Sequence, residues 1–77
     1  MQGKRIKAMI EMLGGHVDLL HSNEVFFYLR TDNMIGKFSI HYDWDTKLYR
    51  LKRGYRGEVL IENLPFKEFK KEFLKIF

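Results

Sequence analysis

The chain has 77 residues, of which 45% are apolar and 16% aromatic, and its net charge is +4. The length fits one domain spanning residues 1–77, and the apolar content is enough for a single core, which excludes a disordered chain. There are no cysteines, which excludes a disulfide framework and a thiolate metal site.

Neither end of the chain suggests a membrane or secreted protein. The charged start, MQGKRIK, is not followed by an uninterrupted apolar stretch, and no window approaches the roughly 18 apolar residues of a membrane span. Small secreted domains usually depend on disulfides. We therefore expect a cytoplasmic protein without a signal peptide and without a membrane partner.

The first element is a helix over residues 3–13. Its apolar positions follow a helical period and form one stripe: Ile6, Met9, Ile10 and Leu13. Gly14 and Gly15 follow, and glycine is the usual residue in the left-handed position that ends a helix. The helix is therefore expected to stop at this pair.

The middle of the chain alternates with a period of two, which is typical of strands. We expect strands at 16–19, 24–30, 37–43, 47–53 and 58–61. Turns are expected at 22–23, at 31–33 with Gly36 shortly after, and at 44–46, and two glycines at 54 and 57 bracket a loop.

The last helix is expected from about Pro65 to the C-terminus, because proline is tolerated in the first turn of a helix. It carries an aromatic stripe with lysines and glutamates on its other faces. The stripe consists of Phe66, Phe69, Phe73, Ile76 and Phe77.

These elements predict an α+β fold. An N-terminal helix, an antiparallel sheet of three to five strands and a C-terminal helix follow one another, and short connections favour antiparallel pairing. Both helices must bury an apolar stripe, so we expect them on one face of the sheet. The element order resembles that of double-stranded-RNA-binding domains and of small toxins with the same arrangement. The lysine cluster that opens the second helix of those RNA binders is not reproduced here, nor is the catalytic histidine pattern of the toxins.

The positive charge is concentrated in one segment, residues 47–57. This segment carries five basic residues and no acid: Lys47, Arg50, Lys52, Arg53 and Arg56. Residues 1–30 have a net charge of +1, residues 31–46 of −2 and residues 58–77 of zero. Charge that served only solubility would be spread more evenly, so the segment is a candidate contact for phosphates.

The strand at 24–30 is apolar on both faces. Val25, Phe27 and Leu29 form one set, and Phe26 and Tyr28 form the other. Strand pleating puts the two sets on opposite faces. If the first set lies under the helices with Phe38, Ile40, Tyr42, Tyr49 and Leu51, the second lies on an open face with Arg30, Lys37, Ser39, His41, Leu48, Arg50 and Lys52.

An open sheet face of this composition is typical of proteins that bind single-stranded nucleic acid, in which rings stack on bases while cations meet phosphates. We therefore predict a non-enzymatic DNA- or RNA-binding protein that uses this face and the arm at 47–57. The predicted contact residues are Phe26, Tyr28, Arg30, Lys37, His41, Arg50, Lys52, Arg53, Tyr55 and Arg56.

The alternative is a protein-interaction module. Surplus apolar residues on a strand are also typical of a face that a protein partner or a second copy covers. A small regulator or inhibitor of a host protein, of the kind that a phage or mobile element encodes, fits this reading.

Residues for catalysis are few, and we expect no enzyme, no metal and no cofactor. His16 and His21 lie on opposite faces of a strand and do not converge as metal ligands. Ser39 and His41 share a strand face without an orienting acid. The least unfavourable enzymatic alternative is a metal-independent nuclease that pairs His41 with Lys37 or Arg50.

Overall fold

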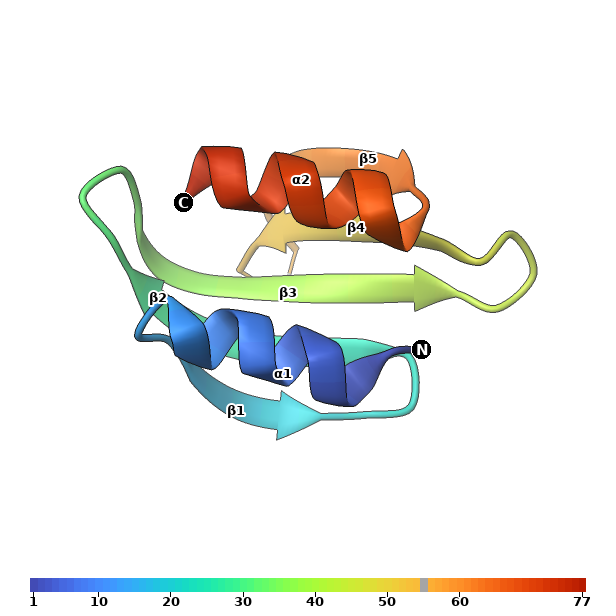
Figure 1. Ribbon diagram of the computed structural model, residues 1–77, viewed down its shortest axis with the longest axis horizontal. Coiled ribbons are helices and arrows are strands. Elements are labelled where there is room, and N and C mark those ends of the chain that lie inside the picture. The colour runs from blue at the N-terminus through green and yellow to red at the C-terminus, as the bar shows by residue number, and fades with distance from the viewer. Residues whose placement is uncertain (55) are drawn as a thin grey trace.

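The computed structural model describes residues 1–54 and 56–77 (Figure 1). The elements in chain order are α1 (Gly3–Met12), β1 (His16–Leu20), β2 (Glu24–Arg30), β3 (Ile35–Asp43), β4 (Leu48–Arg53), β5 (Val59–Leu64) and α2 (Phe66–Ile76). The predicted α+β class with a helix at each end is confirmed, and the sheet has five strands.

The five strands form one antiparallel sheet in the order β1-β2-β3-β4-β5. Each strand therefore pairs with its neighbour in sequence. Phe27 lies opposite Phe38, and Ile40 lies opposite both Val25 and Leu51. Directly opposed residues project to the same face of a sheet, so these side chains form a continuous apolar face.

Both helices cover that apolar face, as the sequence predicts. α1 packs on β1 and β2, α2 packs on β4 and β5, and β3 runs between them (Figure 1). The core between sheet and helices consists of Ile6, Met9, Ile10, Val25, Phe27, Leu29, Phe38, Ile40, Tyr49, Leu51, Ile61, Phe69 and Phe73. The opposite face of the sheet carries neither helix, and we call it the open face.

Aromatic rings join the two halves of the core. The Phe27 ring of β2 stacks on Phe38 of β3, with their centroids 5.6 Å apart. Phe73 and Phe77 reach the same cluster from α2, with centroids 6.1 Å and 6.4 Å from that of Phe27. α2 therefore contributes to the packing of β2 as well as covering β4 and β5.

The start of α1 is held by a tyrosine from the sheet. No side chain caps the helix at Gln2, but the backbone N–H of Gln2 donates a hydrogen bond to the Tyr49 hydroxyl at 3.1 Å. Burial raises the pKa of Tyr49 above its ordinary value, because the phenolate form is poorly solvated there. The neutral hydroxyl is thus the form that links β4 to the helix.

The end of α1 follows the prediction. Gly14 has a φ of +85°, its N–H bonds to the Glu11 carbonyl at 3.0 Å, and the N–H of Gly15 bonds to the Ile10 carbonyl at 2.9 Å. These two bonds are those of a Schellman motif, which satisfies carbonyls at the end of a helix.

Several element boundaries differ from the prediction. β3 begins at Ile35, so Gly36 lies inside the strand, opposite Leu29, instead of in the loop. β5 extends to Leu64, and Pro65 precedes α2 with an extended backbone instead of lying in its first turn. Proline has no N–H for a ladder, so it ends a strand as naturally as it begins a helix.

The turn between β3 and β4 places Lys47 in the left-handed region, with a φ of 59°. The predicted strand begins at Lys47, but in the structure this residue belongs to the turn. The Lys47 N–H donates a hydrogen bond to the Asp43 carbonyl at 2.7 Å. A side chain disfavours this conformation. We expect Lys47→Gly to raise the free energy of unfolding by about 0.5–1 kcal/mol, measured by urea denaturation. Lys47→Ala removes the same charge but keeps the strain, and an equal gain from it would contradict this explanation.

Candidate nucleic-acid interface

Cross-strand pairing assembles the open face from rows of side chains. Tyr28 of β2 lies opposite Lys37 of β3. In the next row Phe26 lies opposite Ser39, and Ser39 lies opposite Lys52 of β4. Adjacent strands are about 4.8 Å apart, so the structure brings the two predicted rings and two of the predicted cations into one compact surface.

A third row carries charges of both signs. His41 lies between Glu24 of β2 and Arg50 of β4, and its Nδ1 is 3.9 Å from the Glu24 carboxylate. Arg50 is half-buried on this face. Glu24 therefore offsets part of the positive charge at this end of the face.

The centre of the face is tied to the loop after β4. Ser39 is only 3% exposed, and its hydroxyl donates a hydrogen bond to the Gly54 carbonyl at 3.0 Å. The N–H of Gly54 in turn bonds to the Lys37 carbonyl at 2.7 Å. Gly54 has a φ of +66°, which a side chain would disfavour. Gly54, at the end of β4, is therefore fixed beside the open face.

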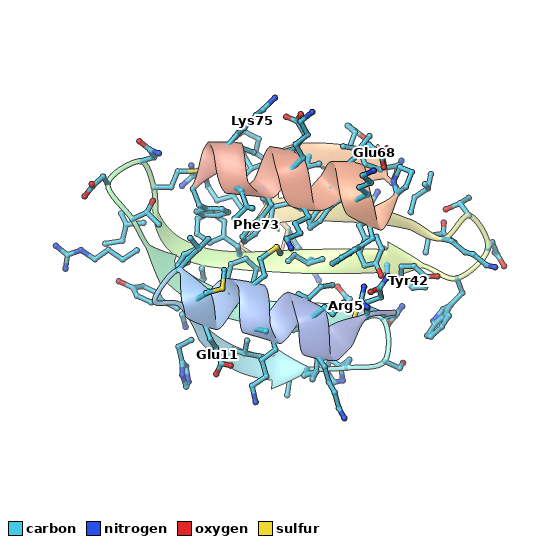
Figure 2. All side chains as sticks on the ribbon, viewed as in Figure 1. Arg5, Glu11, Tyr42, Glu68, Phe73 and Lys75 are labelled. Atoms are coloured by element: carbon cyan, nitrogen blue, oxygen red, sulfur yellow. The ribbon has the colours of Figure 1, made fainter. Side chains whose placement is uncertain are left out.

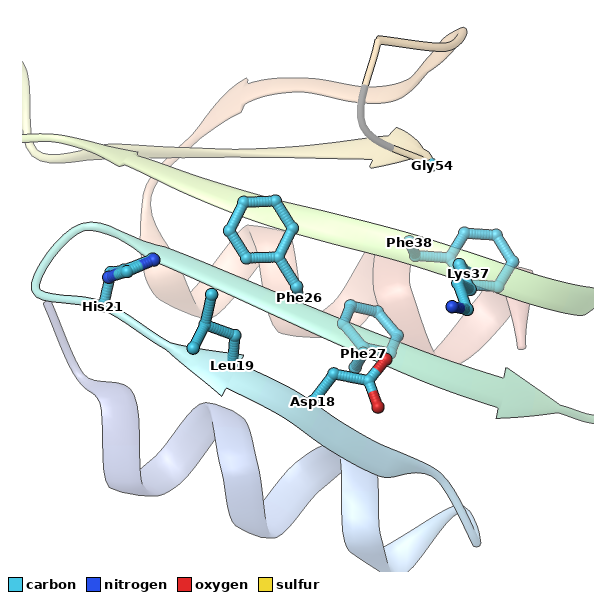
Figure 3. A pocket seen from close by; sticks show the side chains of 8 residues that line it. All are labelled: Asp18, Leu19, His21, Phe26, Phe27, Lys37, Phe38 and Gly54. Atoms are coloured by element: carbon cyan, nitrogen blue, oxygen red, sulfur yellow. The ribbon is translucent and has the colours of Figure 1, made fainter.

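A pocket of about 470 Å³ opens on this face (Figure 3). It is lined by Asp18, Leu19, His21, Phe26, Phe27, Lys37, Phe38 and Gly54. Its walls are mainly apolar, and its polar side chains are the Asp18 carboxylate from β1, the His21 imidazole and the Lys37 ammonium group from β3. Such a mixture suits a planar group with hydrogen-bonding edges, such as a nucleobase.

A bulge in β1 supplies residues that the sequence did not reveal as part of the site. Val17 lies opposite Phe27, but Leu19 lies opposite Phe26, so the register shifts at Asp18. In a regular strand Val17 and Leu19 would project to the same face, but the shift places them on opposite faces. The bulge turns Leu19, which is 49% exposed, to the open face beside Phe26.

Arg53 does not join the open face. It ends β4 opposite Phe38, and its guanidinium carbon is 5.8 Å from the centroid of that ring. Phe38 belongs to the core under the helices, so Arg53 lies at the edge of that face and apart from the cations of the open face. A cation over an aromatic ring is itself stabilising, which accounts for this arginine at the edge of the core.

The remaining predicted contacts lie near the ends of the strands. Arg30 ends β2 on the same face as Tyr28 and is exposed. Arg56 is exposed in the loop between β4 and β5. Tyr55 lies outside the residues that the structure describes. The open face thus carries Arg30, Lys37, Arg50 and Lys52 against Asp18, Glu24 and Asp43, which leaves a small excess of positive charge.

Comparison with protein-family models, curated proteins and solved structures finds no match for this chain. Among residues 1–54 and 56–77, no group of three or more histidines and acids could hold a metal ion. Within the same ranges, neither helix is long and apolar enough to cross a bilayer.

Proposed function

We propose that the protein binds single-stranded nucleic acid on its open face. The observation that carries this proposal is the cross-strand adjacency of the β2 rings, Phe26 and Tyr28, to Lys37 and Lys52. Rings on a sheet stack on bases that are not paired, and neighbouring cations bind the phosphates between them.

The geometry favours a flexible single strand over a duplex. Tyr28 is 39% exposed on the open face, where an unpaired base can lie against the ring. The pocket beside Phe26 has room for a second base, and its Lys37 and Asp18 groups offer a donor and an acceptor to the edge of that base. Bases inside a duplex do not expose their faces to such rings.

The charge pattern predicts binding that depends strongly on salt. Each phosphate neutralised by a cation releases counterions, so the logarithm of affinity falls with that of salt concentration by about 0.7 per contact on a single strand. We expect fluorescein-labelled mixed-sequence DNA and RNA 12-mers to bind, with fluorescence anisotropy reporting affinity between about 50 and 200 mM salt. Replacing Lys37 and Lys52 together by glutamate should weaken binding at least about ten-fold and reduce the salt slope by about 1.4.

The matched control also replaces two lysines by glutamate, but on α2, which covers the opposite face of the sheet. Lys67 and Lys71 are exposed on α2, and replacing both by glutamate alters the net charge by the same amount. This control should leave affinity within about two-fold. Equal losses in the two double variants would reduce the effect to net charge and contradict a site on the open face. Absence of binding to either 12-mer at low salt would reject the proposal and leave a protein as the candidate partner.

A further inference from the structure

A groove separates the two helices on the side of the molecule away from the open face. It has a volume of about 300 Å³. Its walls come from α1 through Arg5, Ala8, Met9 and Met12, and from α2 through Phe66, Lys70 and Leu74. Figure 2 shows Arg5 on the side of α1 that faces α2.

Two large apolar side chains of this groove are exposed. Met12 is 79% exposed and Leu74 is 43% exposed, and they lie on different helices. Neither is needed to fill the core under the sheet. Exposed apolar side chains gathered in a concave site are typical of protein contacts, and methionine adapts to partners of irregular shape.

The charges of α2 are segregated around the helix. Lys70 lies one turn from both Phe66 and Leu74, so it shares their flank, and it lines the groove with them. Glu68 and Lys75 project from the flank away from α1 (Figure 2). Glu72 lies with β5 residues on that outer side and is 3.5 Å from Lys75.

The groove itself is therefore cationic. Its charged lining residues are Arg5 and Lys70, and both carry positive charge. On α1 the acid, Glu11, points away from α2 (Figure 2). The second helix thus keeps its glutamates out of the groove although its overall charge is small.

We propose that this groove binds an acidic amphipathic helix of a protein partner. Apolar residues at helical spacing would contact Met12 and Leu74, which is the usual pattern when a helix binds in a groove. Carboxylates of the partner would pair with Arg5 and Lys70, and arginine matches the planar carboxylate especially well. The 11 residues of α2 span about 16 Å, which sets the length of the bound segment at about three turns.

Other occupants fit these residues less well. A phosphate backbone matches the cations but gives no reason for the exposed Met12 and Leu74. A second copy of the chain offers helices that are themselves rich in lysine, so its charges would repel those of the groove. The inference concerns the face opposite the proposed nucleic-acid interface and does not depend on it.

The test uses a pair of synthetic helical peptides of 12 residues. One carries leucines at positions i, i+3, i+4 and i+7 with glutamates elsewhere, and its partner carries lysine in place of every glutamate. We expect the acidic peptide to bind at least roughly ten-fold more tightly by fluorescence anisotropy. When the acidic peptide binds, the NMR chemical shifts of backbone amides should change most at Ala8, Met12, Lys70 and Leu74.

Variants on both sides of α2 identify the surface. Replacing Arg5 and Lys70 together by glutamate should weaken binding of the acidic peptide roughly ten-fold or more. Lys75→Glu makes a single lysine-to-glutamate change on the outer flank of α2. It should leave the affinity for the acidic peptide within about two-fold. Met12→Ser, at an exposed position that barely affects folding, should weaken binding about three-fold or more through lost apolar contact.

Three results would overturn the proposal. The first is equal affinity for the two peptides. The second is that the acidic peptide changes amide chemical shifts on the open face instead of in the groove. The third is that an oligonucleotide changes the amide chemical shifts of Ala8 and Lys70. The Lys37 and Lys52 double variant should bind the acidic peptide normally. Failure of oligonucleotide binding and failure of peptide binding are therefore distinguishable.

Discussion

Phe27→Ala should remove about 3–5 kcal/mol from the free energy of unfolding, the usual cost of deleting a buried phenylalanine ring. Phe27 is fully buried and contacts rings from β3 and from α2. Its loss opens a cavity where the two halves of the core meet. A domain of this size has a total stability of roughly 5–10 kcal/mol. Urea denaturation followed by circular dichroism should therefore show a variant that has lost roughly a third or more of the free energy of unfolding.

Phe26→Ala is the matched control, since it makes the same substitution in the same strand on the other face. Phe26 is half-buried, so its removal should cost less than about 2 kcal/mol. The variant should remain folded while oligonucleotide binding weakens. A cost for Phe26→Ala as large as that for Phe27→Ala would mean that the open face is packed as tightly as the core.

Gly15→Ala should destabilise the protein by about 1–3 kcal/mol, because it overfills a closely packed site. A methyl group there would lie 2.6 Å from the Ile10 Cγ2 and 3.0 Å from the Leu29 Cδ1. Both neighbours are fully buried and cannot swing away. The expected loss therefore arises from the approach of α1 to β2, measured as a shift of the urea midpoint.

The neighbouring glycine is restricted for a different reason. Among residues 1–54 and 56–77, no atom lies within 4 Å of a methyl group added at Gly14, but the φ of Gly14 is +85°. Gly14→Ala should cost about 1–2 kcal/mol from backbone strain alone, and Gly14→Asn should cost less, since asparagine tolerates this conformation. Gly15→Asn should be worse than Gly15→Ala. The opposite order at either position would show that the two constraints are assigned to the wrong residues.

The faces of the sheet were predictable because strand periodicity is simple and local. The alternation in residues 24–30 places Phe27 on one face of the sheet and Phe26 on the other. The amphipathic helices pack their apolar stripes against the more apolar of these two faces. The short connections likewise determine which strands pair. The helix end at Gly14 was predictable for a similar reason, since one residue type supplies the required backbone conformation.

The incorrect sequence predictions concern features that depend on geometry elsewhere in the fold. A bulge adds one residue to a strand and exchanges the faces beyond it, and the sequence around Asp18 carries no mark of it. Arg53 follows the alternation of β4 and lies opposite Phe38, so its side is fixed by the register of the strand and not by the cluster of basic residues around it. Lys47 adopts a left-handed backbone conformation. The sequence does not indicate this, because glycine is the residue that usually adopts it.

The nearest-neighbour order of the strands has a consequence for how the chain folds. Every strand pairing is between consecutive strands, so the sheet assembles through contacts of short sequence separation, which is the regime of rapid folding. Contacts that close long stretches of chain come from the two ends, through the hydrogen bond of Gln2 to Tyr49 and the packing of Phe73 and Phe77 against β2 and β3. We therefore expect the docking of the two helices to limit the rate of folding more than the pairing of the strands does.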